Sequence, residues 1–261
     1  MHWDFALILI FLATAVPLLG RRRIRQLMQM PETTKRDRLA LYASTIAFQW
    51  LAVAVILWRS SVHGISLARM GLAIPNLALT VTVSIVLAVI ALANQILSLR
   101  RLALRPSEVQ GILPQLALKV FPQDSIERLA FFAVVVTVSA CEELIYRGFA
   151  QTVLGDWFGP GARSFVVASI LASAALFSLG HMYQGQRGLI ATFIVGTLFS
   201  SVRVWTGSLF PSLLAHFVAD WTAGLLAPSQ LRPALAAVQM ISDSPRSDQA
   251  RRGQMHLLLY I

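Results

Sequence analysis

Long apolar runs separated by short polar connections dominate the pattern of the chain. Six of these runs contain no Asp, Glu, Lys or Arg: 5–20, 39–58, 70–99, 164–182, 188–202 and 204–219. Each is long enough, or nearly so, to cross ~30 Å of hydrocarbon as a helix. A seventh segment, 129–154, joins them if its charges are tolerated in the membrane. The pattern therefore predicts an all-α, polytopic membrane helix bundle with about seven transmembrane helices.

Prolines set further boundaries within and between these runs. The 70–99 run is longer than one crossing needs, and Pro75 near its start places the span at about 77–97. Between Arg105 and Arg128, repeated prolines keep the apolar segment below spanning length. We expect this segment to lie on the cytoplasmic face rather than to cross the membrane.

The last part of the chain changes character. From Pro228 onward Ser, Pro, Gln, Asp and Arg dominate, and 243–252 is predicted to be a disordered tail. The expected organisation is an N-terminal set of transmembrane helices with the interfacial segment (1–128), a helical core (129–227), and a polar, flexible cytoplasmic tail (228–261).

Composition agrees with a membrane protein and gives its orientation. The 261 residues are 56% hydrophobic and 13% charged, far more apolar than a soluble domain of this length. The net charge of +10 is concentrated, with seven basic residues in 21–38 and five in 100–128. The positive-inside rule then places the N-terminus outside and the C-terminus in the cytoplasm. These clusters flank helices without interleaved aromatics, which favours contact with anionic lipid and excludes a nucleic-acid partner.

Two features of the chain exclude other classes of protein. The first run is preceded by Asp4 rather than by basic residues and lacks a small-x-small cleavage site before Arg21, so we interpret it as a span and not as a signal peptide. The single cysteine, Cys141, excludes an internal disulfide framework and a cysteine-rich metal site.

The stretch CEELIYRG, 141–148, places charges inside an apolar segment. Helical spacing pairs Glu143 with Arg147 and, about 100° around the helix, Glu142 with Tyr146. Each charge near the bilayer centre costs roughly 2.5–3.5 kcal/mol on insertion scales. Together with Asp220, the charges of this stretch cost on the order of 10 kcal/mol before pairing. Such a cost indicates a functional site.

Two histidines on other helices complete the set of buried polar groups. His181 follows Phe177 by four residues, and His216 precedes Asp220 by four residues. Three separate helices therefore carry a glutamate pair, two histidines and an aspartate that can converge inside a bundle. A carboxylate and an imidazole that share a water molecule can remove its proton, and a second imidazole can stabilise the resulting oxyanion. This combination is typical of an intramembrane hydrolase. The remaining histidines, His2, His63 and His256, are assigned to the surface, and Tyr183 to the membrane interface.

These motifs, EExxxR at 142–147, FxxxH at 177–181 and HxxxD at 216–220, resemble those of the CPBP family of intramembrane glutamic endopeptidases, also called the ABI family. This family includes CAAX proteases and bacteriocin-processing or immunity proteins. The resemblance covers about 129–226 and implies an all-helical protease without cofactor or metal. It also implies that Glu142 and His181 activate water, that His216 and Asp220 form the oxyanion site, and that Glu143 with Arg147 holds Glu142.

Asp220 departs from the asparagine of eukaryotic CAAX proteases. An ionised aspartate cannot donate a hydrogen bond to an oxyanion, so Asp220 is either protonated by burial or accepts a hydrogen bond from His216 and orients it. We expect the second arrangement. The departure weakens any assignment to prenylated CAAX substrates alone.

Four functions fit these residues. The first is a metal-independent endopeptidase in the cell membrane, expected to be a prokaryotic plasma membrane, acting on a membrane-associated peptide or protein of the prenylated CAAX type or the leader or bacteriocin type. The second is a zinc hydrolase with Glu142, His181 and His216 as ligands, although the chain has no HExxH motif. The third is a non-catalytic immunity or scaffold protein of the same family. The fourth is a proton-coupled transporter, against which the missing internal repeat counts.

Overall fold

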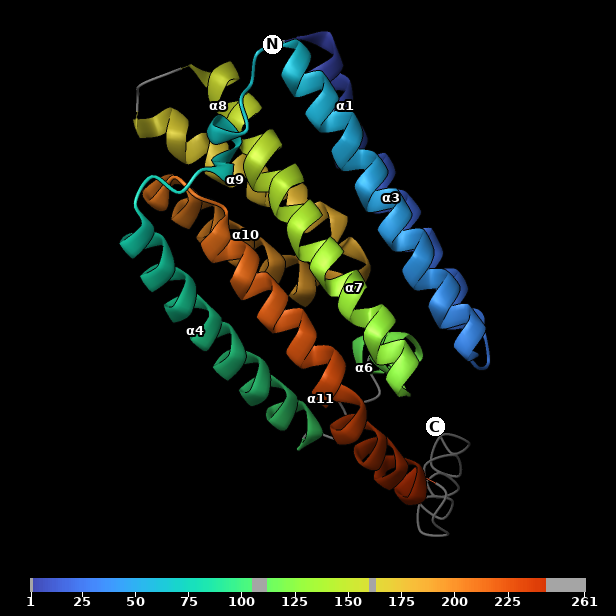
Figure 1. Ribbon diagram of the computed structural model, residues 1–261. Coiled ribbons are helices and arrows are strands. Elements are labelled where there is room, and N and C mark those ends of the chain that lie inside the picture. Colours follow the sequence, from blue (N-terminus) through green and yellow to red (C-terminus); the bar gives the residue numbers. More distant parts are fainter. Residues whose placement is uncertain (1, 105–111, 160–162, 243–261) are drawn as a thin grey trace, which may run out of the picture.

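The computed structural model describes residues 2–104, 112–159 and 163–242, and all regular structure in these ranges is helical. Figure 1 shows long helices lying side by side, with α3, α7, α11 and α4 in succession across the bundle. In chain order the elements are α1 (Trp3–Ala13), α2 (Ala15–Gln29), α3 (Lys35–Val62), η1 (Ala68–Leu72), α4 (Leu77–Ala103), α6 (Ile112–Val120), α7 (Ser125–Glu142), η2 (Glu143–Ala150), α8 (Gln151–Phe158), α9 (Arg163–Gly180), η3 (Met182–Gln184), α10 (Gly185–Thr206) and α11 (Phe210–Ser242).

Six helical segments in the described ranges are long and apolar enough to cross a membrane. They are Trp3–Gln29, Lys35–Val62, Leu77–Arg101, Ser125–Phe158, Arg163–Gly180 and Met182–Thr206. The prediction of an all-helical polytopic bundle is confirmed. Placing the third span after Pro75 is also correct, because α4 begins at Leu77.

The predicted span 204–219 is wrong in its boundaries. Helix α10 ends at Thr206 and α11 begins at Phe210, so this apolar run contains a turn. Gly207 forms it with φ +70°, a conformation that glycine adopts without steric cost. Helix α11 is not among the six segments above, although it packs along α4 and α7 (Figure 1).

The polar segment after Pro228 also differs from the expectation. Helix α11 continues through Pro228 and Pro233 to Ser242, so residues 228–242 are helical, while 243–261 lie outside the described residues. Ala227 and Leu231 are buried against Leu99 of α4. Burial of this apolar face stabilises the helix against the loss of the backbone hydrogen bonds that proline removes. Part of the predicted interfacial segment forms the short helix α6, and 105–111 lie outside the described residues.

Polar groups fix where α3 and α7 begin. Thr34 caps α3 through a reciprocal capping box with Asp37. Asp124 caps α7 by accepting a hydrogen bond from the Glu127 backbone N–H at 2.9 Å. Hydrogen bonds from Lys35 and from this N–H lower the pKa of Asp124 below its ordinary value. One turn inside each helix, Arg38 of α3 and Glu127 of α7 form a buried two-contact ion pair at 2.7 and 3.0 Å, which joins the two helices.

Candidate active site

The paired glutamates lie where the long helix of 125–158 changes its winding. Helix α7 ends at Glu142, and η2, from Glu143 to Ala150, is a π-helix before the α-helical pattern resumes in α8. A π-helical turn widens the helix and is frequent at functional sites. Every residue of η2 is buried. Gly148 allows this close packing, because a Cβ there would lie 3.1 Å from the Met70 carbonyl oxygen.

Glu143 is the centre of a fully buried ionic network. Its Oε1 accepts hydrogen bonds from Arg147 Nη1 at 3.0 Å and from His216 Nδ1 at 3.1 Å. The side chains of Glu143 and Arg147 both have 0% exposure. The Arg147 guanidinium also stacks on the ring of Phe177, 4.0 Å from its centroid. This network therefore links η2 with α9 and α11.

Glu142 lies one residue earlier and faces a different set of partners. Its Oε1 accepts a hydrogen bond from Gln49 Nε2 of α3 at 3.1 Å. Its Oε2 lies 4.0 Å from Nε2 of His181 and 4.0 Å from Nε2 of His216. This second oxygen is buried and makes no hydrogen bond within the described residues. One carboxylate oxygen is thus held by an amide, and the other faces both imidazoles.

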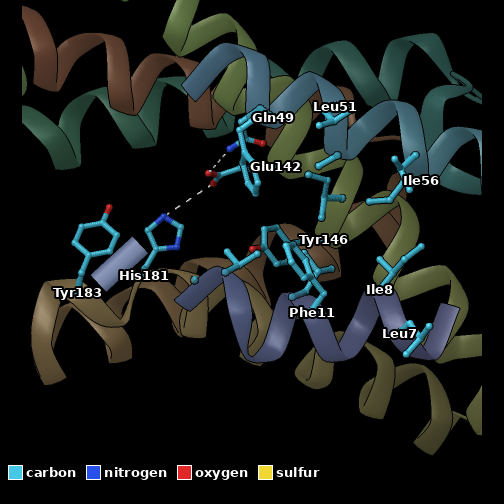
Figure 2. A pocket seen from close by; sticks show the side chains of 17 residues that line it. Leu7, Ile8, Phe11, Gln49, Leu51, Ile56, Glu142, Tyr146, His181 and Tyr183 are labelled. Atoms are coloured by element: carbon cyan, nitrogen blue, oxygen red, sulfur yellow. Dashed lines mark hydrogen bonds and ion pairs between the residues drawn. The ribbon is translucent and has the colours of Figure 1, made fainter. Parts of the chain in front are cut away.

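The contacts of His181 determine its tautomer. The residue follows the last turn of α9, and its Nδ1 lies 2.9 Å from the Phe177 carbonyl oxygen. A carbonyl only accepts, so Nδ1 carries the hydrogen and the neutral ring presents an unprotonated Nε2. That nitrogen faces Glu142 Oε2 (Figure 2). His181 can therefore accept a proton on the side of the glutamate.

His216 has a carboxylate on each side of its ring. Nδ1 contacts Glu143, and Nε2 lies 3.5 Å from Asp220 Oδ2, which is one turn along α11. An imidazolium donates from both nitrogens, so this arrangement suits the charged ring. Asp220 is 44% exposed and its contact with His216 is long, so Nε2 keeps access to the space in front of Glu142.

Two cavities meet at these residues. An apolar cavity of about 500 Å³ lies between α1 and α3 and reaches Glu142 and His181 (Figure 2). A second cavity of about 620 Å³ extends between α6, α7 and α11 and includes His216 and Asp220. Gln49, Glu142, His181 and Tyr183 line both cavities. A substrate in either cavity therefore reaches the same polar centre.

The structure brings all six predicted site residues together: Glu142, Glu143, Arg147, His181, His216 and Asp220. The expected Glu143–Arg147 contact is present. Asp220 lies 3.5 Å from His216 Nε2, but the acceptor that holds the ring at its other nitrogen is Glu143 and not Asp220 as expected. The contacts of Glu143 differ from the expectation, because it holds His216 and not Glu142. No hydrogen bond joins Glu142 to Tyr146 within the described residues; both instead line the apolar cavity.

Three other polar or aromatic residues lie differently from the sequence-based assignment. Gln49, which binds Glu142, was not identified, although it is the only amide in the apolar run 39–58. Tyr183, assigned to the membrane interface, lines both cavities. His63, assigned to the surface, forms a partly buried contact with Asp4 at 2.9 Å.

The side chains in the described ranges form no group of three or more His, Cys, Asp or Glu with the arrangement of a metal site. In particular, Glu142, His181 and His216 are not placed as three ligands of one zinc ion.

Comparison with known proteins confirms the family resemblance. Residues 124–222 match the family described as "Type II CAAX prenyl endopeptidase Rce1-like". A 110-residue segment is 29% identical to the uncharacterized protein YpbD of Bacillus subtilis strain 168. That alignment covers 39% of this chain and 47% of YpbD, so the chain matches about half the length of this relative. No solved structure gives a significant match. The family match supports protease activity of the CAAX type in general and gives no support to the non-catalytic alternative.

Proposed function

Since residues 124–222 match the CAAX prenyl endopeptidase family, we propose that the protein is a metal-independent intramembrane glutamic endopeptidase. One observation carries the proposal. Glu142 Oε2 lies 4.0 Å from the Nε2 atoms of both His181 and His216. This separation is too long for direct hydrogen bonds and suits one water molecule or one substrate group between the three side chains.

In the first step, Glu142 and His181 activate the water molecule. Glu142 Oε2 is the free oxygen of the carboxylate, and His181 presents an unprotonated Nε2 because its Nδ1 donates to Phe177. Together they accept a proton from water, whose oxygen attacks the carbonyl carbon of the peptide bond. The C–N bond then breaks, and the same proton passes to the leaving nitrogen.

His216 stabilises the charge that develops on the substrate carbonyl oxygen. Its Nε2 lies 4.0 Å from Glu142 Oε2 and can donate into the space in front of Glu142, while Glu143 accepts from Nδ1 and holds the ring. A donor fixed before the reaction stabilises an oxyanion without a reorganisation cost. Arg147 in turn fixes Glu143, and Asp220 flanks the donor nitrogen from the exposed side.

The two cavities indicate the kind of substrate. The cavity between α1 and α3 has an apolar lining that includes Leu7, Phe11, Leu51 and Val55, all exposed on the apolar surface of the bundle. It is suited to the apolar part of a membrane-associated peptide or protein, with the peptide chain continuing into the second cavity. Prenylated CAAX-type peptides and leader or bacteriocin-type peptides both have this character.

The six membrane-spanning segments and the family match indicate a multi-pass membrane protein. We place it in a prokaryotic plasma membrane, with the N-terminus outside and the active site reached from the cytoplasmic leaflet. Cysteine labelling of a position 181 variant from each side of the membrane tests this orientation, and labelling of position 181 from the outer face contradicts it.

The decisive experiment is cleavage of a quenched peptide library, including prenylated CAAX peptides, by detergent-purified protein. Glu142→Gln should lower the rate by about 10²–10⁴-fold, the contribution of a positioned general base. Cys141→Ala is the matched control, because it changes the neighbouring buried residue and removes the thiol, yet should leave the rate unchanged.

The alternatives give different results in the same assay. A parallel reaction with a chelator distinguishes the zinc hydrolase, whose cleavage would be lost. Absence of cleavage by the wild-type protein for every peptide would favour an immunity or scaffold function.

A further inference from the structure

Gln49 occupies an unusual position for an amide. It lies in the middle of α3, among the apolar residues of a membrane-spanning segment. An amide inside a membrane span is costly without hydrogen bonds, so its partner matters. That partner is Glu142, whose Oε1 lies 3.1 Å from Gln49 Nε2 (Figure 2). Helix α3 lies outside residues 124–222, so this contact comes from a part of the chain that the family match does not cover.

The contact determines how the carboxylate of Glu142 is turned. A glutamate side chain rotates easily about its last bond, which exchanges its two oxygens. Binding of Oε1 by Gln49 leaves Oε2 as the oxygen that faces His181 and His216 at 4.0 Å each. Without the amide, nothing among the contacts of Glu142 in the described ranges fixes this orientation. The reaction proposed above needs Oε2 in this place.

We propose that Gln49 is a positioning residue, which holds the Glu142 carboxylate so that Oε2 faces the reacting water. This inference rests on the proposed function for its kinetic consequence. It assigns to α3 a direct part in the site, in addition to its packing against α7.

A purely structural role for Gln49 makes a different prediction, and the chain offers a matched control. The neighbouring residue, Trp50, also joins α3 to α7, through a hydrogen bond from Nε1 to Thr137 Oγ1 at 3.2 Å. Thr137→Val removes that interhelical hydrogen bond without touching Glu142. If Gln49 only joins the helices, a substitution of Gln49 and Thr137→Val should have similar effects on stability and on cleavage.

The test compares Gln49→Met, which keeps the side-chain length but removes the donor, with Thr137→Val in the peptide cleavage assay. Hydrogen bonds to charged groups have strengths that correspond to about 10- to 100-fold in rate. We expect kcat of Gln49→Met to fall by this factor with KM within about twofold of the wild type. Thr137→Val should show the same change in thermal stability with kcat unchanged. A wild-type kcat in Gln49→Met, or an equal fall in both variants, overturns the proposal.

A spectroscopic measurement keeps the proposal independent of activity. The carboxylate stretching band of Glu142 is identified in the infrared spectrum by its loss in Glu142→Gln. This band should shift in Gln49→Met and stay in place in Thr137→Val. An unshifted band shows that Gln49 does not hold the carboxylate, even if no peptide is cleaved. If the band shifts in Gln49→Met but the wild-type protein cleaves no peptide, the contact between Gln49 and Glu142 is supported and the proposed function is rejected.

Discussion

The buried network around Glu143 leads to a prediction that separates stability from activity. Glu143 Oε1 accepts hydrogen bonds from Arg147 and His216, and neither Glu143 nor Arg147 is exposed. We consider three variants: Glu143→Leu, Arg147→Met, and the double variant with both substitutions. Each replaces a charged side chain by an apolar one of similar size.

The single variants should differ in cost. Glu143→Leu leaves the Arg147 cation buried without a carboxylate, which costs about 3–5 kcal/mol of unfolding free energy. Arg147→Met leaves Glu143 paired with His216, so the loss is that of one charged hydrogen bond, about 1.5–3 kcal/mol. In the double variant no unpaired charge remains on either helix position, and the loss should be at most about 2 kcal/mol. The predicted coupling is therefore about 2.5 kcal/mol or more.

Activity should follow a different order. Glu143→Leu and the double variant both remove the acceptor of His216 Nδ1, so both should lose most of kcat although the double variant is the more stable. Arg147→Met keeps this acceptor and should retain more activity than either. Stability is measured by reversible unfolding in mixed detergent micelles followed by circular dichroism, and kcat by peptide cleavage.

An exposed ion pair supplies the control. Arg69 and Asp156 lie 2.6 Å apart, but their side chains are 52% and 50% exposed. The corresponding variants, Asp156→Leu, Arg69→Met and the double variant, should give a coupling of about 0–1 kcal/mol. Coupling at Glu143 and Arg147 that is no larger than this control refutes the burial argument. Full activity in the double variant refutes the role of Glu143 in holding His216.

Two further predictions concern other parts of the bundle. Arg38→Met leaves Glu127, whose side chain is 1% exposed, as a buried charge without its ion-pair partner. This change should lower the unfolding free energy by about 3–5 kcal/mol in the same unfolding experiment. A loss below about 1 kcal/mol would contradict the importance of the pair. Ala52→Trp places a large ring in the apolar cavity between α1 and α3. In parallel cleavage assays it should raise KM severalfold for a lipid-bearing peptide and change KM little for the same peptide without the lipid. Equal changes in KM for the two peptides would argue against lipid binding in this cavity.

Hydropathy was sufficient to predict most of the membrane segments, because length and apolar composition decide which helices can cross a bilayer. It failed where two helices share one apolar run. The turn at Gly207 carries no charge, so composition alone does not mark it, and only the glycine itself signals the break. The prediction of a flexible segment after Pro228 was wrong for the opposite reason. Local composition favours a loop there, but packing of Leu231 against Leu99 is a tertiary contact that the local sequence does not contain.

Within the site, the contacts at helical spacing were predictable and the contacts across helices were only partly so. His216 and Asp220 are one turn apart on α11, and their contact follows from that spacing. The π-helical winding of η2 changes the direction of each side chain after Glu143, and the spacing of an ordinary α-helix does not predict it. Glu143 also binds His216 of another helix, a contact that spacing within one helix does not contain, whereas the expectation was that Glu143 with Arg147 would hold Glu142.

Gln49 shows most clearly why sequence motifs alone predict only part of this site. Motifs are recognised within one helix, whereas the orientation of Glu142 depends on an amide that lies 93 residues away in the chain. The physical signal was nevertheless in the sequence, because an amide inside a membrane span is expensive unless a partner binds it. Uncharged polar residues at the same depth are costly for the same physical reason as the buried charges of 142–147. An N-terminal helix without sequence motifs can therefore determine how the Glu142 carboxylate of the core is oriented.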